Sequence, residues 1–284
     1  MSSDRIDLHA HTVESDGSLE PETLVALAAQ VGLRALAVTD HDTTAAIDAA
    51  RAAGRSLHVE ILTGIEITAR FPPRAMHVLA YGFDRREKHL VEMLETIVAG
   101  RDRRNPRIVA RLVELGVPVT MDEVREESGG AVVGRPHIAR AMVKRGHVPD
   151  TRSAFQQYLR DGGPAFVAAE SVEPREVIAA VRGAGGVTVL ADPRQLRLDG
   201  EAAYAALVSE LAAAGLNGIE VDHPSQKPDE RAMFRRLAAA NGLVASGGSD
   251  FHGEAKPDIR LGVGDGTIAI GYETWEALRA LCAA

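Results

Sequence analysis

Short runs of strand-forming residues alternate along the chain with longer segments in which apolar residues recur every three to four positions. The first pattern is typical of buried strands and the second of amphipathic helices. The predicted strands cover residues 5–10, 35–40, 58–69, 75–83, 185–192, 218–223 and 243–250. The predicted helices cover residues 21–31, 45–53, 202–214, 229–240 and 273–281. Repeated alternation of this kind indicates a parallel α/β architecture.

The stretch from residue 99 to residue 165 interrupts this alternation. Its pattern is helical and rich in Arg, and Gly162, Gly163 and Pro164 mark the return to alternating strands and helices. Exposed helix faces are the simplest interpretation of these arginines, and a lid over an active site is the alternative. We therefore predict an α/β body made of residues 1–98 and 166–284, with a small helical insertion at residues 99–165.

Ionisable residues stand at or near the carboxyl end of nearly every predicted strand. In an α/β barrel, the carboxyl ends of the strands form the active face. Random polar substitutions would not select that end repeatedly. The pattern therefore favours a barrel over an open sheet and places a candidate site at one end of it.

Two pairs of candidates have the spacing of alternate strand positions. His9 and His11, and again Asp250 and His252, are separated by one residue, which puts both members of a pair on the same face. Two imidazoles that project together can bind one divalent metal, although hydrogen-bonded polar residues at a strand edge have the same spacing. Asp16 follows in the turn SDGS, where a metal-ligand role and a turn role are both open.

The other strand-end residues have ordinary structural explanations when each is taken alone. Glu66 could pair with an Arg inside the barrel, His77 could be a hydrogen-bonded core residue, and Asp42 is expected as a helix N-cap or first-turn residue. The remaining strand-end candidates are Asp40, His41, Asp192, Glu220, Asp222 and His223. Together, these imidazoles and carboxylates suit a cluster of two or three Mn, Fe or Zn ions, an arrangement that hydrolyses phosphoesters.

The composition indicates what class of protein this is and where in the cell it is expected. The 284 residues are 45% hydrophobic and 25% charged, which is ordinary for a globular protein, and the single Cys282 cannot form a disulfide within the chain. No apolar run reaches the length of a signal peptide or a membrane span, so we expect a cytoplasmic protein without a membrane partner. The net charge of −8 gives no bulk attraction for nucleic acid.

Five motifs, in a fixed order, resemble those of the PHP (polymerase and histidinol phosphatase) family. They are DLHAHTVESDGS, VTDHD, GIEIT, MHVLAYG and GSDFHG. The resemblance implies a distorted (β/α)7 barrel that holds two or three divalent metal ions, with Mn favoured and Fe or Zn as alternatives. The metal ligands that it implies are His9, His11, Asp16, His41, Glu66, His77, Asp192, Asp250 and His252.

Asp192 departs from the family pattern, which usually has His in an AHP motif at this position. A carboxylate is a harder ligand than imidazole, so the exchange favours Mn or Mg, or leaves the second metal site partly occupied. The residues that follow Asp192 also differ from the family's usual segment. Arg194 is the candidate for binding substrate on this side.

The segment RPHIARAMV, residues 135–143, resembles the insertion of the PHP enzymes that act on nucleotides. These include 3′,5′-nucleotide bisphosphate phosphatases and 5′-to-3′ exoribonucleases. The resemblance implies that Arg135 and His137 face the substrate phosphate, and an Arg suits bidentate binding of phosphate. An exposed Arg and a histidine at a helix start are the ordinary alternative.

We therefore expect hydrolysis of a phosphomonoester on a small nucleotide-like substrate, with a hydroxide that bridges the metals as nucleophile. His223 and Asp250 are the predicted catalytic residues. His223 serves as the general acid or, equally, contacts substrate or has a purely structural role. Asp40 is expected to orient His41. The alternatives are an exoribonuclease on short RNA, a cyclic-phosphate or histidinol-phosphate hydrolase, and a non-catalytic barrel that binds a phosphorylated ligand.

Overall fold

A computed structural model describes residues 4–168 and 170–282 and shows a curled eight-stranded sheet, in the order β7-β6-β5-β4-β3-β2-β1-β8. The strands are β1 (Arg5–Asp7), β2 (Ala35–Val38), β3 (Glu60–Phe71), β4 (Arg74–Tyr81), β5 (Val187–Leu190), β6 (Gly218–Asp222), β7 (Val244–Gly247) and β8 (Ile270–Gly271). The segment after β7 pairs with the segment after β1 through a parallel bridge between Ala10 and Phe251. This pairing brings the sheet close to a closed barrel and confirms the expected fold class.

Most neighbouring strands are parallel, but β4 is antiparallel to both β3 and β5, and β8 is antiparallel to β1. Only two residues, Pro72 and Pro73, connect β3 to β4, and so short a connection can join only antiparallel strands. The barrel is therefore distorted at the β3–β4 pair. The apolar pattern did not reveal β8, which is only two residues long.

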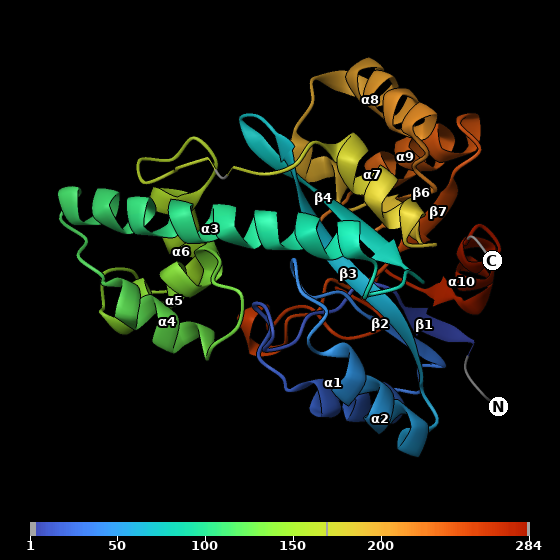
Figure 1. The fold of residues 1–284 in the computed structure, drawn as a ribbon, viewed down its shortest axis with the longest axis horizontal. Coiled ribbons are helices and arrows are strands. Elements are labelled where there is room, and N and C mark those ends of the chain that lie inside the picture. Colours follow the sequence, from blue (N-terminus) through green and yellow to red (C-terminus); the bar gives the residue numbers. More distant parts are fainter. Residues whose placement is uncertain (1–3, 169, 283–284) are drawn as a thin grey trace.

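Helices pack on the outside of the sheet (Figure 1). They are α1 (Pro21–Gln30), α2 (Ile47–Leu57), α7 (Pro174–Gly183), α8 (Gly200–Ala214), α9 (Pro228–Ala240) and α10 (Tyr272–Arg279). Five of them were expected within a few residues of these bounds. The sequence pattern did not predict α7, which follows the insertion and packs against β3, β4 and β5.

A second group of helices projects from one end of the barrel (Figure 1). It comprises α3 (Lys88–Glu114), α4 (Met121–Ser128), α5 (Arg135–Lys144) and α6 (Thr151–Ala154), the last followed by a π-helical turn over Phe155–Leu159. The first turns of α3 pack on the barrel core through Leu90 and Ile97, whereas Ile108 and Leu112 belong to a separate cluster with α4 and α5. The long helix α3 thus ties the helical group to the barrel.

None of the helices in the described ranges combines the length and the apolar composition that crossing a membrane requires.

Candidate metal centre

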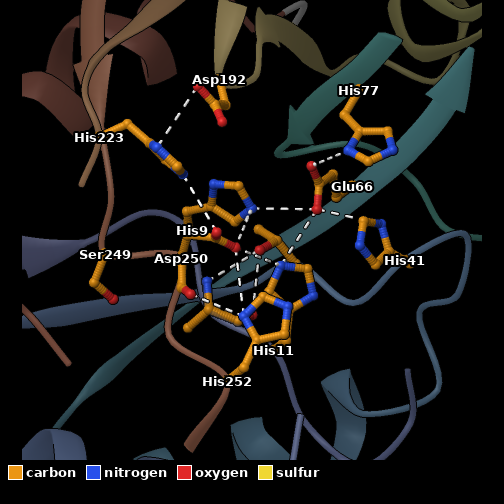
Figure 2. A network of polar contacts seen from close by, with 12 residues as sticks. His9, His11, His41, Glu66, His77, Asp192, His223, Ser249, Asp250 and His252 are labelled. Carbon is orange, nitrogen blue, oxygen red and sulfur yellow. Dashed lines mark hydrogen bonds and ion pairs between the residues drawn. The ribbon is translucent and has the colours of Figure 1, made fainter. Parts of the chain in front are cut away.

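Glu66 lies at the centre of the candidate site, on β3, with its side chain buried inside the barrel (Figure 2). Its Oε2 lies 3.2 Å from His9 Nε2, 3.3 Å from His11 Nε2 and 3.2 Å from His41 Nδ1. Its Oε1 lies 3.0 Å from His77 Nδ1, which β4 supplies from the neighbouring strand. One carboxylate therefore faces four imidazoles that come from three parts of the sheet: the segment after β1, the segment after β2, and β4.

Two further groups of ligand-type atoms flank Glu66. In the first, Asp16 Oδ1 lies 3.3 Å from His252 Nε2 and 3.6 Å from His11 Nδ1. In the second, Asp250 lies 3.6 Å from His9 Nε2 and 3.4 Å from His223 Nε2. Asp250 adopts a φ of 53°, a left-handed conformation that Asp tolerates better than most residues. This bend turns its carboxylate towards the histidines of the β1 segment.

These residues fit divalent metal ions. In four groups of three or four residues, the ligand atoms all lie within 4.8 Å of one another. Two imidazole nitrogens in the groups, His11 Nε2 and His41 Nδ1, are fully buried and have no hydrogen-bond partner. A buried polar atom without a partner is costly, and coordination to a metal would satisfy each of these nitrogens.

Burial and neighbouring charges shift the pKa values of the histidines and carboxylates in this centre. Burial opposes the protonation of His11, but the carboxylates of Asp250 and Glu66, which would accept from the protonated ring, outweigh it and raise the pKa of His11 to about 9. Burial lowers the pKa of His41 to about 3, although Glu66 and Asp16 act in the opposite direction. Burial also opposes the ionisation of Glu66, yet the surrounding histidines hold its pKa well below the ordinary value. Because metal ligands must be deprotonated, a metal that binds at His11 releases a proton.

Glu220 contacts the nitrogen of His9 that faces away from Glu66. This carboxylate on β6 is fully buried, and its Oε1 lies 2.8 Å from His9 Nδ1. Its Oε2 accepts a hydrogen bond from the backbone N–H of Asp192 at 2.8 Å. The sequence marked Glu220 as a strand-end residue but assigned it no role. A carboxylate in this position fixes the tautomer and the direction of the imidazole.

Replacing Glu220 with Gln is expected to weaken metal binding by about ten- to one-hundredfold, because His9 loses the group that orients it. The dissociation constant for Mn²⁺, measured by calorimetry, checks this expectation. Glu210→Gln, on the exposed face of α8, is the matched control. Equal Mn²⁺ affinity in the two variants would show that Glu220 does not support the metal site.

Two neighbouring aspartates have roles other than those expected. Asp40 accepts hydrogen bonds from Thr12 and Ser15 and so fixes the turn that carries Asp16. In the described residues no hydrogen bond or ion pair joins the Asp40 carboxylate to the His41 ring, so the predicted orienting role is wrong. Asp42 is no helix cap, because α2 begins only at Ile47.

Asp42 instead joins the insertion to the barrel. It accepts hydrogen bonds from Thr68 N–H at 2.7 Å and from Arg101 Nε at 2.7 Å, and both it and Arg101 are buried. Asp42 adopts a φ of 57° and follows His41 directly. The long helix α3 is therefore anchored beside the metal centre.

Asp192 lies at the edge of the network, where it contacts His223 (Figure 2). Its Oδ1 accepts a hydrogen bond from Ser225 Oγ at 2.7 Å and lies 3.7 Å from His223 Nδ1. Ser225 Oγ also lies 2.9 Å from His223 Nδ1. Asp192 belongs to none of the four groups of ligand atoms found among the described residues. Its geometry suits a residue that positions His223.

An Asp192→Asn variant separates this positioning role from the metal-ligand role that the sequence predicts. We expect unchanged metal content and a kcat lowered by about tenfold, because His223 loses a group that positions it but keeps its ring. Metal analysis by mass spectrometry and phosphate-release kinetics are the measurements, with the exposed Asp199→Asn as control. A loss of metal from Asp192→Asn alone would make Asp192 a ligand after all.

The residues proposed to bind substrate lie on two sides of the centre. Arg135, at the start of α5, pairs with Asp161 at 2.6 Å. His137 is buried, and its Nδ1 accepts a hydrogen bond from Gly134 N–H at 2.9 Å. Burial, together with the charge of Arg140, lowers the pKa of His137 to about 4, so its imidazole is neutral at neutral pH. With Nδ1 as acceptor, the proton of this neutral ring is on Nε2.

Arg194 lies on the opposite side, where it lines a cavity of about 580 Å³ beside Asp192. Its Nε lies 3.0 Å from Glu230 Oε1, and its Nη1 donates to the carbonyl oxygen of Ser225 at 2.5 Å. Arg194 thus holds the segment that carries Ser225. Lys256, which the strand pattern did not single out, donates to Asp250 Oδ2.

Comparisons with known proteins agree with this geometry. Residues 7–127 match the PHP domain model. The chain is 35% identical to a 5′-3′ exoribonuclease of Haemophilus influenzae, over 87% of this chain and 90% of that protein. It is 32% identical to a 3′,5′-nucleoside bisphosphate phosphatase of Chromobacterium violaceum, over 97% of this chain and 96% of that protein.

A solved structure from Bifidobacterium adolescentis, assigned as a metal-dependent phosphoesterase, matches with a TM-score of 0.87 and 36% identity. The match covers 98% of this chain and 96% of that chain. The fold, the ordered motifs and the cluster around Glu66 thus agree with the relatives along almost the whole length of the chain. The chain belongs to the PHP family and is a metal-dependent phosphoester hydrolase.

Proposed function

We propose that the chain hydrolyses a phosphomonoester on a small nucleotide-like substrate, such as a 3′,5′-nucleotide bisphosphate. The observation that carries this proposal is the convergence of four imidazoles on the Glu66 carboxylate. The Chromobacterium violaceum relative, whose name specifies such a phosphatase, aligns with 97% of the chain and adds support. The lone Cys282 suits a reducing cytoplasm, which we propose as its setting.

Two or three divalent ions, with Mn²⁺ proposed before Fe²⁺ or Zn²⁺, would be held by the residues around Glu66, Asp16 and Asp250. Such ions make water a stronger nucleophile and neutralise the oxygens of a phosphoryl group. His9 and His11 follow β1, His41 follows β2 and His77 lies on β4, so neighbouring parts of the sheet would hold the imidazole ligands of such ions. Arg135 and His137 would contribute N–H donors to a phosphate that enters from the α5 side.

His223 is proposed to protonate the leaving oxygen of the substrate. Its Nε2 is buried without a hydrogen-bond partner and lies 3.4 Å from Asp250, so it faces the centre. Ser225 and Asp192 lie against its other nitrogen, and Arg194 holds Ser225. An imidazole in this arrangement can deliver a proton from Nε2 while Nδ1 stays in contact with Ser225.

A second candidate function is 5′-to-3′ exonuclease action on short RNA. The Haemophilus influenzae relative bears this name, and its 35% identity slightly exceeds that of the phosphatase relative. A site for several nucleotides usually presents stacked aromatic side chains and a basic groove. The aromatic content of 4% and the net charge of −8 favour the small substrate.

A substrate panel tests the proposal. Phosphate release by the Mn-loaded protein is compared for a nucleoside 3′,5′-bisphosphate, mononucleotides, histidinol phosphate, a ribose cyclic phosphate and a 5′-phosphorylated RNA. We expect the highest kcat/KM on the bisphosphate. Stepwise release of mononucleotides from the RNA, at a higher kcat/KM than any small ester, would replace the proposal with the exonuclease function.

A further inference from the structure

The two oxygens of the Asp250 carboxylate have different surroundings. Oδ1 lies 3.6 Å from His9 Nε2 and 3.5 Å from His11 Nε2. Oδ2 lies 3.4 Å from His223 Nε2 and 2.5 Å from Lys256 Nζ. One oxygen thus faces the imidazoles of the metal centre, whereas the other faces His223 and the ammonium group of Lys256.

The backbone around Lys256 is held by hydrogen bonds. The N–H of Lys256 donates to the carbonyl oxygen of Gly253 at 3.1 Å, and its carbonyl oxygen accepts from Ile259 N–H at 3.0 Å. The N–H of Glu254 donates to Ser18 Oγ at 2.8 Å, which ties this loop to the segment after β1. The loop therefore presents the Lys256 side chain from a fixed position.

A substrate can reach the Lys256 side chain from solvent. This side chain is 41% exposed, whereas the side chain of Asp250 is 14% exposed. An ammonium group has three N–H donors, and across the described ranges those of Lys256 have a single acceptor, Asp250 Oδ2. A lysine amine is protonated at neutral pH. Lys256 therefore keeps a positive charge and free N–H groups beside the metal centre.

Lys256 and His223 contact the same oxygen of Asp250. A substrate oxygen that approaches His223 Nε2 therefore also comes close to Lys256 Nζ. His223 is the proposed donor of the proton to the leaving oxygen. Negative charge develops on that oxygen as its bond to phosphorus breaks, and a fixed cation beside it stabilises the transition state more than the ground state.

We propose that Lys256 is a further catalytic residue, which donates a hydrogen bond from Nζ to the leaving oxygen of the substrate. As the P–O bond to the leaving group breaks, His223 Nε2 gives its proton to that oxygen, and Lys256 keeps all of its own protons. This inference rests on the proposed function and deepens it, because it adds a residue that stabilises the leaving group to the same site.

The ordinary interpretation of Lys256 is a counterion for Asp250, and the two roles predict different results. A counterion acts through Asp250 on the metal centre, so its loss would change metal binding and slow all substrates alike. A hydrogen bond to the leaving oxygen matters most when that oxygen belongs to an alcohol, as in a nucleoside 3′,5′-bisphosphate. It matters least for 4-nitrophenyl phosphate, because the nitrophenolate ion spreads its charge over the ring.

The test compares Lys256→Met with Lys88→Met, which changes an 88% exposed side chain at the start of α3. The full-length, Mn-loaded proteins are assayed with 3′,5′-bisphosphoadenosine and 4-nitrophenyl phosphate. For Lys256→Met we expect kcat for the bisphosphate to fall about 100-fold, the usual effect of removing one donor to a developing oxyanion. Its KM for the bisphosphate and its kcat for 4-nitrophenyl phosphate should stay close to wild type. Lys88→Met should match the wild type throughout.

Metal binding is measured in parallel. Lys256→Met should keep the full Mn content by mass spectrometry, and its Mn²⁺ affinity by calorimetry should not fall, because removing a positive charge does not disfavour a cation. His223→Asn, which removes the proton donor, should show the same dependence on the leaving group. Equal losses of kcat by Lys256→Met on both esters, weaker Mn²⁺ binding, or an unchanged kcat for the bisphosphate would overturn the proposal.

Failure of the proposed function can be told apart from failure of this residue. If the wild type hydrolyses 4-nitrophenyl phosphate but not the bisphosphate, the proposed substrate is wrong. Benzyl phosphate, whose leaving oxygen is also that of an alcohol, then replaces the bisphosphate in the comparison. If the wild type hydrolyses the bisphosphate and Lys256→Met slows both esters equally, the function stands and Lys256 is not catalytic. No turnover of any of the three esters by the wild type would refute both.

Discussion

Replacing Glu66 with Gln is expected to lower kcat/KM for phosphate release by about a thousandfold or more, since metal ions supply several kcal/mol of transition-state stabilisation. Glu66 faces four histidines, so its charge contributes to more than one of the ligand groups. The variant should also lose about one metal ion per chain, because a neutral amide is a poor replacement for a carboxylate. Mass spectrometry for metal content and phosphate-release kinetics measure both effects.

The control for this variant is Glu114→Gln, at the exposed end of α3. It removes the same charge from the surface and should leave both quantities unchanged. His9→Ala is a second variant. It removes a ligand from the segment after β1 and should lower kcat/KM to a similar extent. Full activity of Glu66→Gln with full metal content would remove Glu66 from the site.

Breaking the buried pair between Asp42 and Arg101 is expected to have the largest effect on stability. Asp42→Asn keeps the left-handed backbone conformation, which Asn tolerates, but it leaves the Arg101 guanidinium without a counterion. Removing one partner of a buried ion pair costs about 3 kcal/mol or more in the free energy of unfolding. Urea denaturation of the variant and the wild type measures this cost.

A double variant shows whether the cost comes from the unpaired charge. Asp42→Asn combined with Arg101→Met removes both charges and should be less destabilised than Asp42→Asn alone. The exposed pair of Arg103 and Glu170 is the control, because breaking it with Glu170→Gln should cost at most about 1 kcal/mol. If the loss of unfolding free energy in the double variant equals the sum of the losses in the two single variants, Asp42 and Arg101 do not stabilise each other.

Much of the fold could be predicted because strands and helices alternate with clear periods. The strand-end pattern also located the metal centre, since a barrel gathers the carboxyl ends of its strands at one face. His9, His11 and Glu66 are brought together in this way, although 57 residues separate His9 from Glu66. The antiparallel direction of β4 follows from the short connection at Pro72 and Pro73, which the pattern alone did not reveal.

The missed roles belong to residues whose partners lie far away in the chain. Glu220 contacts His9 across 211 positions, and Asp42 meets Arg101 across 59 positions. No local pattern encodes such pairs, because they depend on how α3 and β6 pack against the rest of the barrel.

The most direct test of the central claim is phosphate release from a nucleoside 3′,5′-bisphosphate as Mn²⁺ is added back to chelator-treated protein, with His9→Ala measured in parallel. We expect no turnover after chelation, a rise that saturates at two or three Mn²⁺ per chain, and no recovery in His9→Ala. Full turnover by the chelated protein, or equal turnover by His9→Ala, would contradict a metal-dependent phosphoesterase built around Glu66.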